Sequence, residues 1–176
     1  MHNLHLVVVK ADSPQEACDT VESQISEFGN ENNWRTICGC VSSKDKVFEP
    51  KNDFGGRWSP KEKGYSTIAE LNKTVESWMK PDYKGASAIE KFKTEKDITK
   101  WNRNELWSLE QYAKQLYEVK IIEENKAFDK KEGKKVKKGF DILSEEYFAY
   151  SYAECGVTNV GGEGKETYVV FVDMHD

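Results

Sequence analysis

Residues 4–9 have the sequence LHLVVV, and residues 168–172 have the sequence YVVFV. Both are short runs of apolar, largely β-branched side chains, which are typical of β-strands covered on both faces. They lie near opposite ends of a chain of 176 residues. Because each run needs neighbouring strands and cover on two faces, we expect the two strands to be central and side by side in one sheet.

The first strand leads into a helix. Ser13 can cap the helix N-terminus, Pro14 occupies its first turn, and Glu16 completes an S-x-x-E capping box. Apolar residues then recur at helical spacing as far as Phe28, and Gly29 supplies a stop. The sequence therefore predicts a strand followed by a helix in the first thirty residues.

Further elements follow along the chain. Alternation over residues 34–41 predicts a strand, with Cys38 and Cys40 on the same face. Helical spacing predicts helices over about 67–79, 86–92 and 104–126. Residues 143–155 fit either a helix or a strand, with the helix slightly favoured. The buried face of the longest predicted helix is formed by Leu106, Leu109, Ala113 and Leu116.

These elements predict an α+β fold. We expect a small mixed or antiparallel sheet that contains both terminal strands and packs against helices, as in a ferredoxin-like sandwich with a helical insertion. The expected organisation is one domain over residues 1–176, with the mainly helical insertion at about 66–128. A chain of this length can bury a sizeable core without disulfides or metals.

Composition excludes some classes of protein. The 26 Lys and Arg against 31 Asp and Glu give a net charge of −5, which does not favour a nucleic-acid partner. No apolar run approaches the roughly 18 residues of a membrane-spanning helix, so we expect no membrane partner. The N-terminus lacks the features of a secretory signal, and the four cysteines form no dense framework. We therefore expect a cytoplasmic protein with reduced thiols.

Standard catalytic motifs are missing. The sequence contains no phosphate-binding loop, dinucleotide fingerprint, G-x-S-x-G or H-E-x-x-H. Cys38-x-Cys40 could bind a soft metal together with Cys18 and Cys155, but the spacing is not the usual C-x2-C. Ordinary buried thiols are the better interpretation. We expect no cofactor and no metal.

Two segments supply candidate site residues. The adjacent Gly55 and Gly56 let Arg57 present its planar guanidinium to a carboxylate or phosphate, with Trp58 as a stacking wall. A purely structural role, in which Trp58 anchors the loop to the core, is the stronger interpretation of this segment. The other segment is the end of the last predicted strand, with Asp173 and His175.

Asp173 and His175 are the catalytic candidates, because alternate strand residues share a face and strand ends often carry ligand sites. His175 could act as an acid–base group, alone or together with His5 or His2. Fraying at a chain terminus is the competing interpretation.

A lysine-rich segment at 129–138 holds six Lys against two acids. It could contact nucleic acid or an acidic partner by charge alone, although a solvated loop is the commoner role of such a segment. The candidate contact residues are Lys134, Lys135, Lys137 and Lys138.

Three stretches together carry a resemblance: the strand at 5–11 leading into the capped helix, the Phe54–Ser59 turn, and the end at 170–175. The pattern is similar to uncharacterised small cytosolic proteins of tailed bacteriophages, including T4-like phages. It covers about the first 60 and the last 15 residues and carries no known activity. The resemblance implies a setting in the cytoplasm of an infected bacterium. It also implies proximity between the candidate groups Gly55, Gly56, Arg57, Trp58, Asp173 and His175.

The preferred hypothesis is a phage accessory protein that binds a host or phage protein, with contact surfaces at 42–64 and 129–139. The competing hypothesis is a small enzyme acting on an anionic, phosphate-bearing substrate, with Arg57 as the clamp and His175 as the acid–base group. Weak nucleic-acid binding through the lysines is a third hypothesis. The sequence leaves the oligomeric state open.

Overall fold

The fold is known from a computed structural model, which describes residues 2–26, 34–51, 57–78, 83–134, 140–143 and 155–175. The chain divides into two compact units. The sheet unit comprises Met1–Thr74 and Asp141–Asp176, and the helical unit comprises Val75–Phe140.

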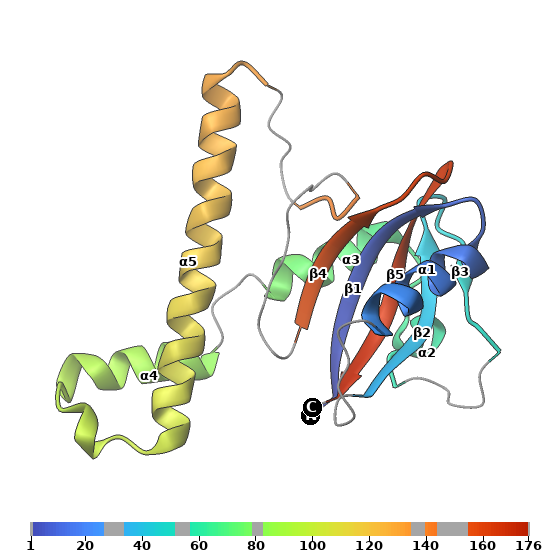
Figure 1. Ribbon diagram of the computed structural model, residues 1–176. Helices are drawn as coiled ribbons and strands as arrows, with labels where there is room; N and C mark the ends of the chain where they lie inside the picture. The colour runs from blue at the N-terminus through green and yellow to red at the C-terminus, as the bar shows by residue number, and fades with distance from the viewer. Residues whose placement is uncertain are drawn as a thin grey trace. The chain divides into compact units, whose positions relative to one another are not determined.

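A five-stranded sheet forms the first unit (Figure 1). Its strand order is β3-β2-β5-β1-β4; β1 and β4 are parallel, and the other neighbours are antiparallel. The predicted α+β class, with a small mixed sheet that contains both terminal strands, is confirmed. The strands are β1 (His2–Ala11), β2 (Trp34–Ser42), β3 (Val47–Phe48), β4 (Cys155–Gly161) and β5 (Glu166–His175).

The two terminal strands pair along their whole length. His2 lies opposite His175 at one end of the β1–β5 ladder, and Ala11 lies opposite Glu166 at the other. The strand that begins the described chain and the strand that ends it are therefore neighbours, as predicted. This pairing brings residues about 170 positions apart in the sequence into one corner of the sheet.

Helix α1 (Pro14–Ser26) connects β1 to β2, with β5 inserted between these two strands. A ferredoxin-like sandwich has the same split βαβ unit. The predicted cap is present: the amide of Glu16 donates to Ser13 Oγ at 3.1 Å, and the amide of Asp12 donates to Glu16 Oε2 at 2.8 Å. α1 packs its inner face on one side of the sheet, in a core formed by Val7, Val9, Ala11, Ala17, Cys18, Val21, Ile37, Cys40, Tyr168, Val170 and Val172.

The opposite side of the sheet is covered by α2 (Pro60–Lys63) and the first turns of α3 (Ile68–Trp78). The Tyr65 ring meets the fully buried Phe171 ring edge-on, with 5.8 Å between centroids. Leu71 of α3 is also fully buried. Cover on both faces explains why β1 and β5 are nearly continuous apolar runs.

A β-bulge interrupts β2, because its register with β5 shifts between Ile37 and Gly39. Gly39 has φ +138°, and a Cβ there would lie 2.5 Å from the carbonyl oxygen of Phe48. The prediction that Cys38 and Cys40 lie on the same face of the strand is wrong because of this bulge. Cys40 belongs to the core beneath α1, whereas the Cys38 sulfur meets the backbone amide of Trp58.

The helical unit contains α4 (Tyr83–Thr94), the short 3-10 helix η1 (Ile98–Lys100) and α5 (Arg103–Lys131). α4 packs on α5, and Phe92 meets Trp101 edge-on with 6.0 Å between ring centroids. The predicted buried face of α5 is wrong for two of its residues: Leu106 is 38% exposed, and Ala113 is exposed as well. α4 covers α5 from another side.

None of the helices within the described ranges is long and apolar enough to cross a membrane. The question of a helix or a strand at 143–155 falls mostly on residues 144–154, which lie outside the described residues, and β4 begins at Cys155.

Candidate functional site

The end of β5 carries the buried carboxylate of Asp173, which is 7% exposed. Because β1 and β5 are antiparallel, the start of β1 lies beside this end, with Leu4 opposite Asp173. His2 Nδ1 lies 3.1 and 3.0 Å from the two carboxylate oxygens of Asp173. The carboxylate therefore orients the imidazole ring through one nitrogen, and the His2 side chain is 41% exposed.

Cys38 lies at the β2 bulge and connects this corner to the turn before α2. Its thiol donates to the carbonyl oxygen of Thr36 at 3.4 Å. The backbone amides of both Trp58 and Asp173 donate toward its sulfur. The structure thus brings the Trp58 segment and the Asp173 segment together on either side of a single thiol.

The chemistry of Cys38 is that of an unreactive thiol. Burial raises its pKa to about 11, although the two amides act in the other direction. At neutral pH the group is protonated and 3% exposed, so it is not a nucleophile. Its role is to hold two backbone segments next to each other.

Arg57 and Trp58 lie in the turn before α2. The ammonium of Lys63 lies 5.0 Å from the centroid of the Trp58 ring, and Trp58 Nε1 is buried with no hydrogen-bond partner in the described part of the chain. Arg57 is exposed. Trp58 is thus half-buried and Arg57 is open to solvent, and the anchoring and ligand-binding roles of this segment both stay predictions.

His5 has different surroundings from His2, because side chains alternate along a strand and residues three positions apart point to opposite faces. Burial, followed by the nearby Arg35 guanidinium, lowers the pKa of His5 to about 4. Its Nε2 lies 2.8 Å from Thr158 Oγ1. His2 is consequently the histidine that contacts Asp173, and His5 is a neutral, hydrogen-bonded group inside the sheet unit.

Several of the predicted site residues lie outside the residues that the structure describes, and for His175 only the backbone is described. Gly55 and Gly56 lie outside the described residues, as do Lys135, Lys137 and Lys138. His175 is placed in β5 opposite His2, but only its backbone is described. Lys134 is exposed, with its ammonium 3.4 Å from Asp129 Oδ1. Within the described ranges, no group of three or more His, Cys, Asp or Glu side chains could hold a metal.

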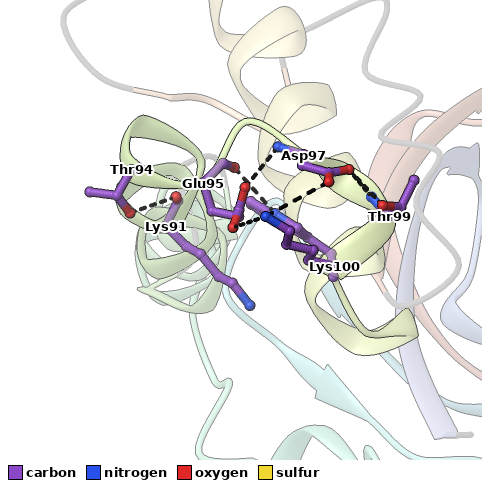
Figure 2. Close-up of polar contacts among 7 residues, drawn as sticks. Lys91, Thr94, Glu95, Asp97, Thr99 and Lys100 are labelled. Atoms are coloured by element: carbon purple, nitrogen blue, oxygen red, sulfur yellow. Dashed lines mark hydrogen bonds and ion pairs between the residues drawn. The ribbon is translucent and has the colours of Figure 1, made fainter.

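A second candidate surface lies in the helical unit, at the connection between α4 and α5 (Figure 2). Asp97 caps η1 by accepting from the Thr99 amide at 3.1 Å and the Thr99 hydroxyl at 2.6 Å. The Lys100 ammonium lies 3.2 Å from Glu95 and 3.8 Å from Asp97. Trp101 is 6% exposed, and its Nε1 donates to the Glu95 carbonyl oxygen at 3.3 Å. These contacts fix the connection.

Three large apolar side chains in and just after this connection are exposed, and we call them the apolar corner: Ile98 in η1, and Leu106 and Trp107 near the start of α5. They are 53%, 38% and 44% exposed. Phe128, near the other end of α5, is 60% exposed. These four are the exposed large apolar residues of the described chain, and all of them belong to the helical unit.

Helical spacing does not reveal the apolar corner, because it places Leu106 in line with the half-buried Leu109 and gives no reason to separate Trp101 from Trp107. The useful signal was the capping pair of Asn102 and Glu105, which fixes where α5 starts.

Comparison of the chain with protein-family models, curated proteins and solved structures gives no match. The resemblance to phage proteins therefore remains a prediction.

Proposed function

We propose that this protein acts by binding another protein and that the helical unit carries the contact surface. The supporting observation is that the large apolar side chains left exposed in the described chain all lie in that unit. Exposed aromatic and aliphatic side chains on a rigid support are the usual anchors of protein interfaces. Trp107 is the expected central anchor, and Leu106 and Ile98 are the expected further apolar contacts.

The proposed setting is the cytoplasm of a bacterium infected by a tailed phage, and the proposed partner is a host or phage protein. This part of the proposal rests on the three resembling stretches of sequence. Charged side chains lie in the same connection, among them Glu95, Asp97 and Lys100. They support a partner whose contact has a small apolar centre and a polar rim, as in non-obligate complexes.

The test is affinity capture by the full-length protein from infected and uninfected lysates. We expect one partner in stoichiometric amount and at least about a tenfold loss of capture for Trp107→Asp, as for a hot-spot residue. Glu22→Ala, on the exposed face of α1, is the matched control and retains the partner. The proposal fails if no stoichiometric partner appears or if Trp107→Asp captures it equally well.

A second candidate function is an enzyme acting on an anionic substrate. The observation that favours it is the His2–Asp173 pair next to the Trp58 segment, because a carboxylate-oriented imidazole is a suitable acid–base group. In this version His2 takes the role that the sequence suggested for His175, and Arg57 remains the clamp. Screening for phosphoesterase and nucleotide hydrolysis tests it. An activity that survives both His2→Gln and Arg57→Ala removes the candidate.

A further inference from the structure

Two cysteines face each other in the core of the sheet unit. Cys18 lies on α1 and Cys40 on β2, and they are 3% and 0% exposed. Both belong to the apolar cluster beneath α1, and their thiols are hydrogen-bonded to each other. This contact joins a helix and a strand that the binding function does not involve, so the inference below is independent of that function.

The local geometry holds the pair together. The Cys40 thiol also lies 3.8 Å from the carbonyl oxygen of Pro14. Pro14 and Cys18 are four residues apart in α1 and therefore share one face of the helix. Cys40 therefore contacts two residues one turn apart in α1, Pro14 and Cys18. The other side chains of the cluster are apolar except for the Tyr168 hydroxyl. The two thiols therefore lie in one buried cluster on directly packed elements, which is the arrangement from which a disulfide can form.

We propose that Cys18 and Cys40 are an oxidation site, at which a hydroperoxide converts the two thiols into a disulfide that fastens α1 to β2. In the first step one thiolate attacks the peroxide, the O–O bond breaks, and the sulfur becomes a sulfenic acid. In the second step the other sulfur attacks the sulfenic sulfur, forming the S–S bond and releasing water. Overall, two electrons pass from the two thiols to the peroxide. The first step releases water from hydrogen peroxide or an alcohol from an organic hydroperoxide, and the second step releases one further water.

The fold controls the rate of this reaction. The hydrogen bond with Cys18 and burial raise the pKa of Cys40 well above its usual value, so the closed core holds unreactive thiols. The reaction therefore proceeds through transient opening of α1, at a rate that follows the population of the open form. Once formed, the disulfide opposes that opening, and the sheet unit becomes more stable.

The experiment uses the full-length chain in a Cys155→Ser background, treated with hydrogen peroxide and then analysed by peptide mass spectrometry. We expect a product lighter by two hydrogen atoms, with the Cys18 and Cys40 peptides linked and released by dithiothreitol. Closing a loop of about 20 residues should raise the Tm by roughly 5–10 °C. Urea below the unfolding midpoint should accelerate formation of the bond, since it increases opening.

Cys38→Ser is the matched control. It changes a buried thiol two residues from Cys40 that contacts backbone groups of Trp58 and Thr36, and it should leave the linkage intact. Cys18→Ala and Cys40→Ala should each abolish the linkage; if either fails to fold, peptide mapping of the parent chain decides. Sulfinic or sulfonic acid at Cys18 or Cys40 without a link, a link to Cys38, or no oxidation at temperatures where α1 opens would each overturn the proposal.

Discussion

No large apolar side chain among the described residues of the sheet unit is exposed, whereas the helical unit exposes four. The two units also differ in net charge. The helical unit has 16 Lys and Arg against 12 Asp and Glu, or +4, which leaves 10 against 19, or −9, for the sheet unit. One unit buries its apolar surface in a two-faced sheet, while the other displays apolar surface on a basic helical support.

The difference separates two kinds of stability. The sheet unit depends on burial, which contributes about 25 cal/mol for each Å² of apolar surface removed from water. Among its described side chains, the helical unit shows the contact of Trp101 with Phe92 and the cap of α5, and its exposed ion pairs add little. Substitutions in the two units should therefore have effects of very different size.

The largest expected effect comes from Phe171→Ala in β5. Phe171 is fully buried in the sheet and packs against Tyr65, so its truncation leaves a cavity and should cost about 3–5 kcal/mol in the free energy of unfolding. Trp107→Ala in the helical unit removes a 44% exposed side chain and should change that free energy by less than about 0.5 kcal/mol. Urea unfolding of the two variants measures both values.

Failure of Phe171→Ala to fold, with Trp107→Ala folding normally, supports the same conclusion. Equal losses in the two variants would contradict the comparison, because they would mean that Trp107 is part of a core.

The next effect is a dependence on pH confined to the sheet unit. His5 has a pKa of about 4 in the fold and about 6.5 when unfolded. Between these values the unfolded chain binds the proton and the fold does not, so stability is complete above pH 6.5 and falls as the pH decreases toward 4. The loss amounts to about 3 kcal/mol over that window. Urea unfolding between pH 7.5 and 4.5 measures it.

His5→Gln is the control for this prediction, since glutamine does not titrate. The variant should lose the His5 contribution, so the difference in pH dependence between parent and variant isolates it from the carboxylates. Identical pH profiles for the two proteins would show that His5 is not the cause.

A smaller effect is expected at the start of α5. Asn102 Oδ1 accepts from the Glu105 amide at 3.0 Å, and Glu105 Oε2 accepts from the Asn102 amide at 3.0 Å. Asn102→Ala should cost about 1 kcal/mol by removing this cap. Thermal melting followed by far-UV circular dichroism measures the loss, and Asn104→Ala, an exposed residue two positions on, should change little. Equal melting of both variants with the parent would mean that α5 does not depend on its cap.

The sheet unit was predictable where the local sequence pattern agrees with what the whole fold requires. The runs at 4–9 and 168–172 had to be covered on both faces, which predicts two central strands, and β1 and β5 are neighbours in the sheet. The cap at Ser13 fixed the start of α1. Strand β4 was missed, because its sequence at 155–161 lacks a long apolar run and its parallel partner is far away in the sequence.

The candidate site was predictable only in part. Sequence proximity to the strand end indicated Asp173, but the choice of His2 depends on strand alternation across a ladder whose register the sequence does not specify. Cys38 as the contact between Trp58 and Asp173 depends on the β2 bulge, and the nearby Gly39 signalled a special backbone position without indicating which side chain it redirects.

Native-state hydrogen exchange tests the division between the two units most directly, because it reports the opening free energy of each element in one measurement. The amides of β1 and β5 should exchange most slowly, at least about 100-fold more slowly than those of α4 and α5. Amides of α5 as protected as those of β5, or fast exchange along β1, would contradict the account.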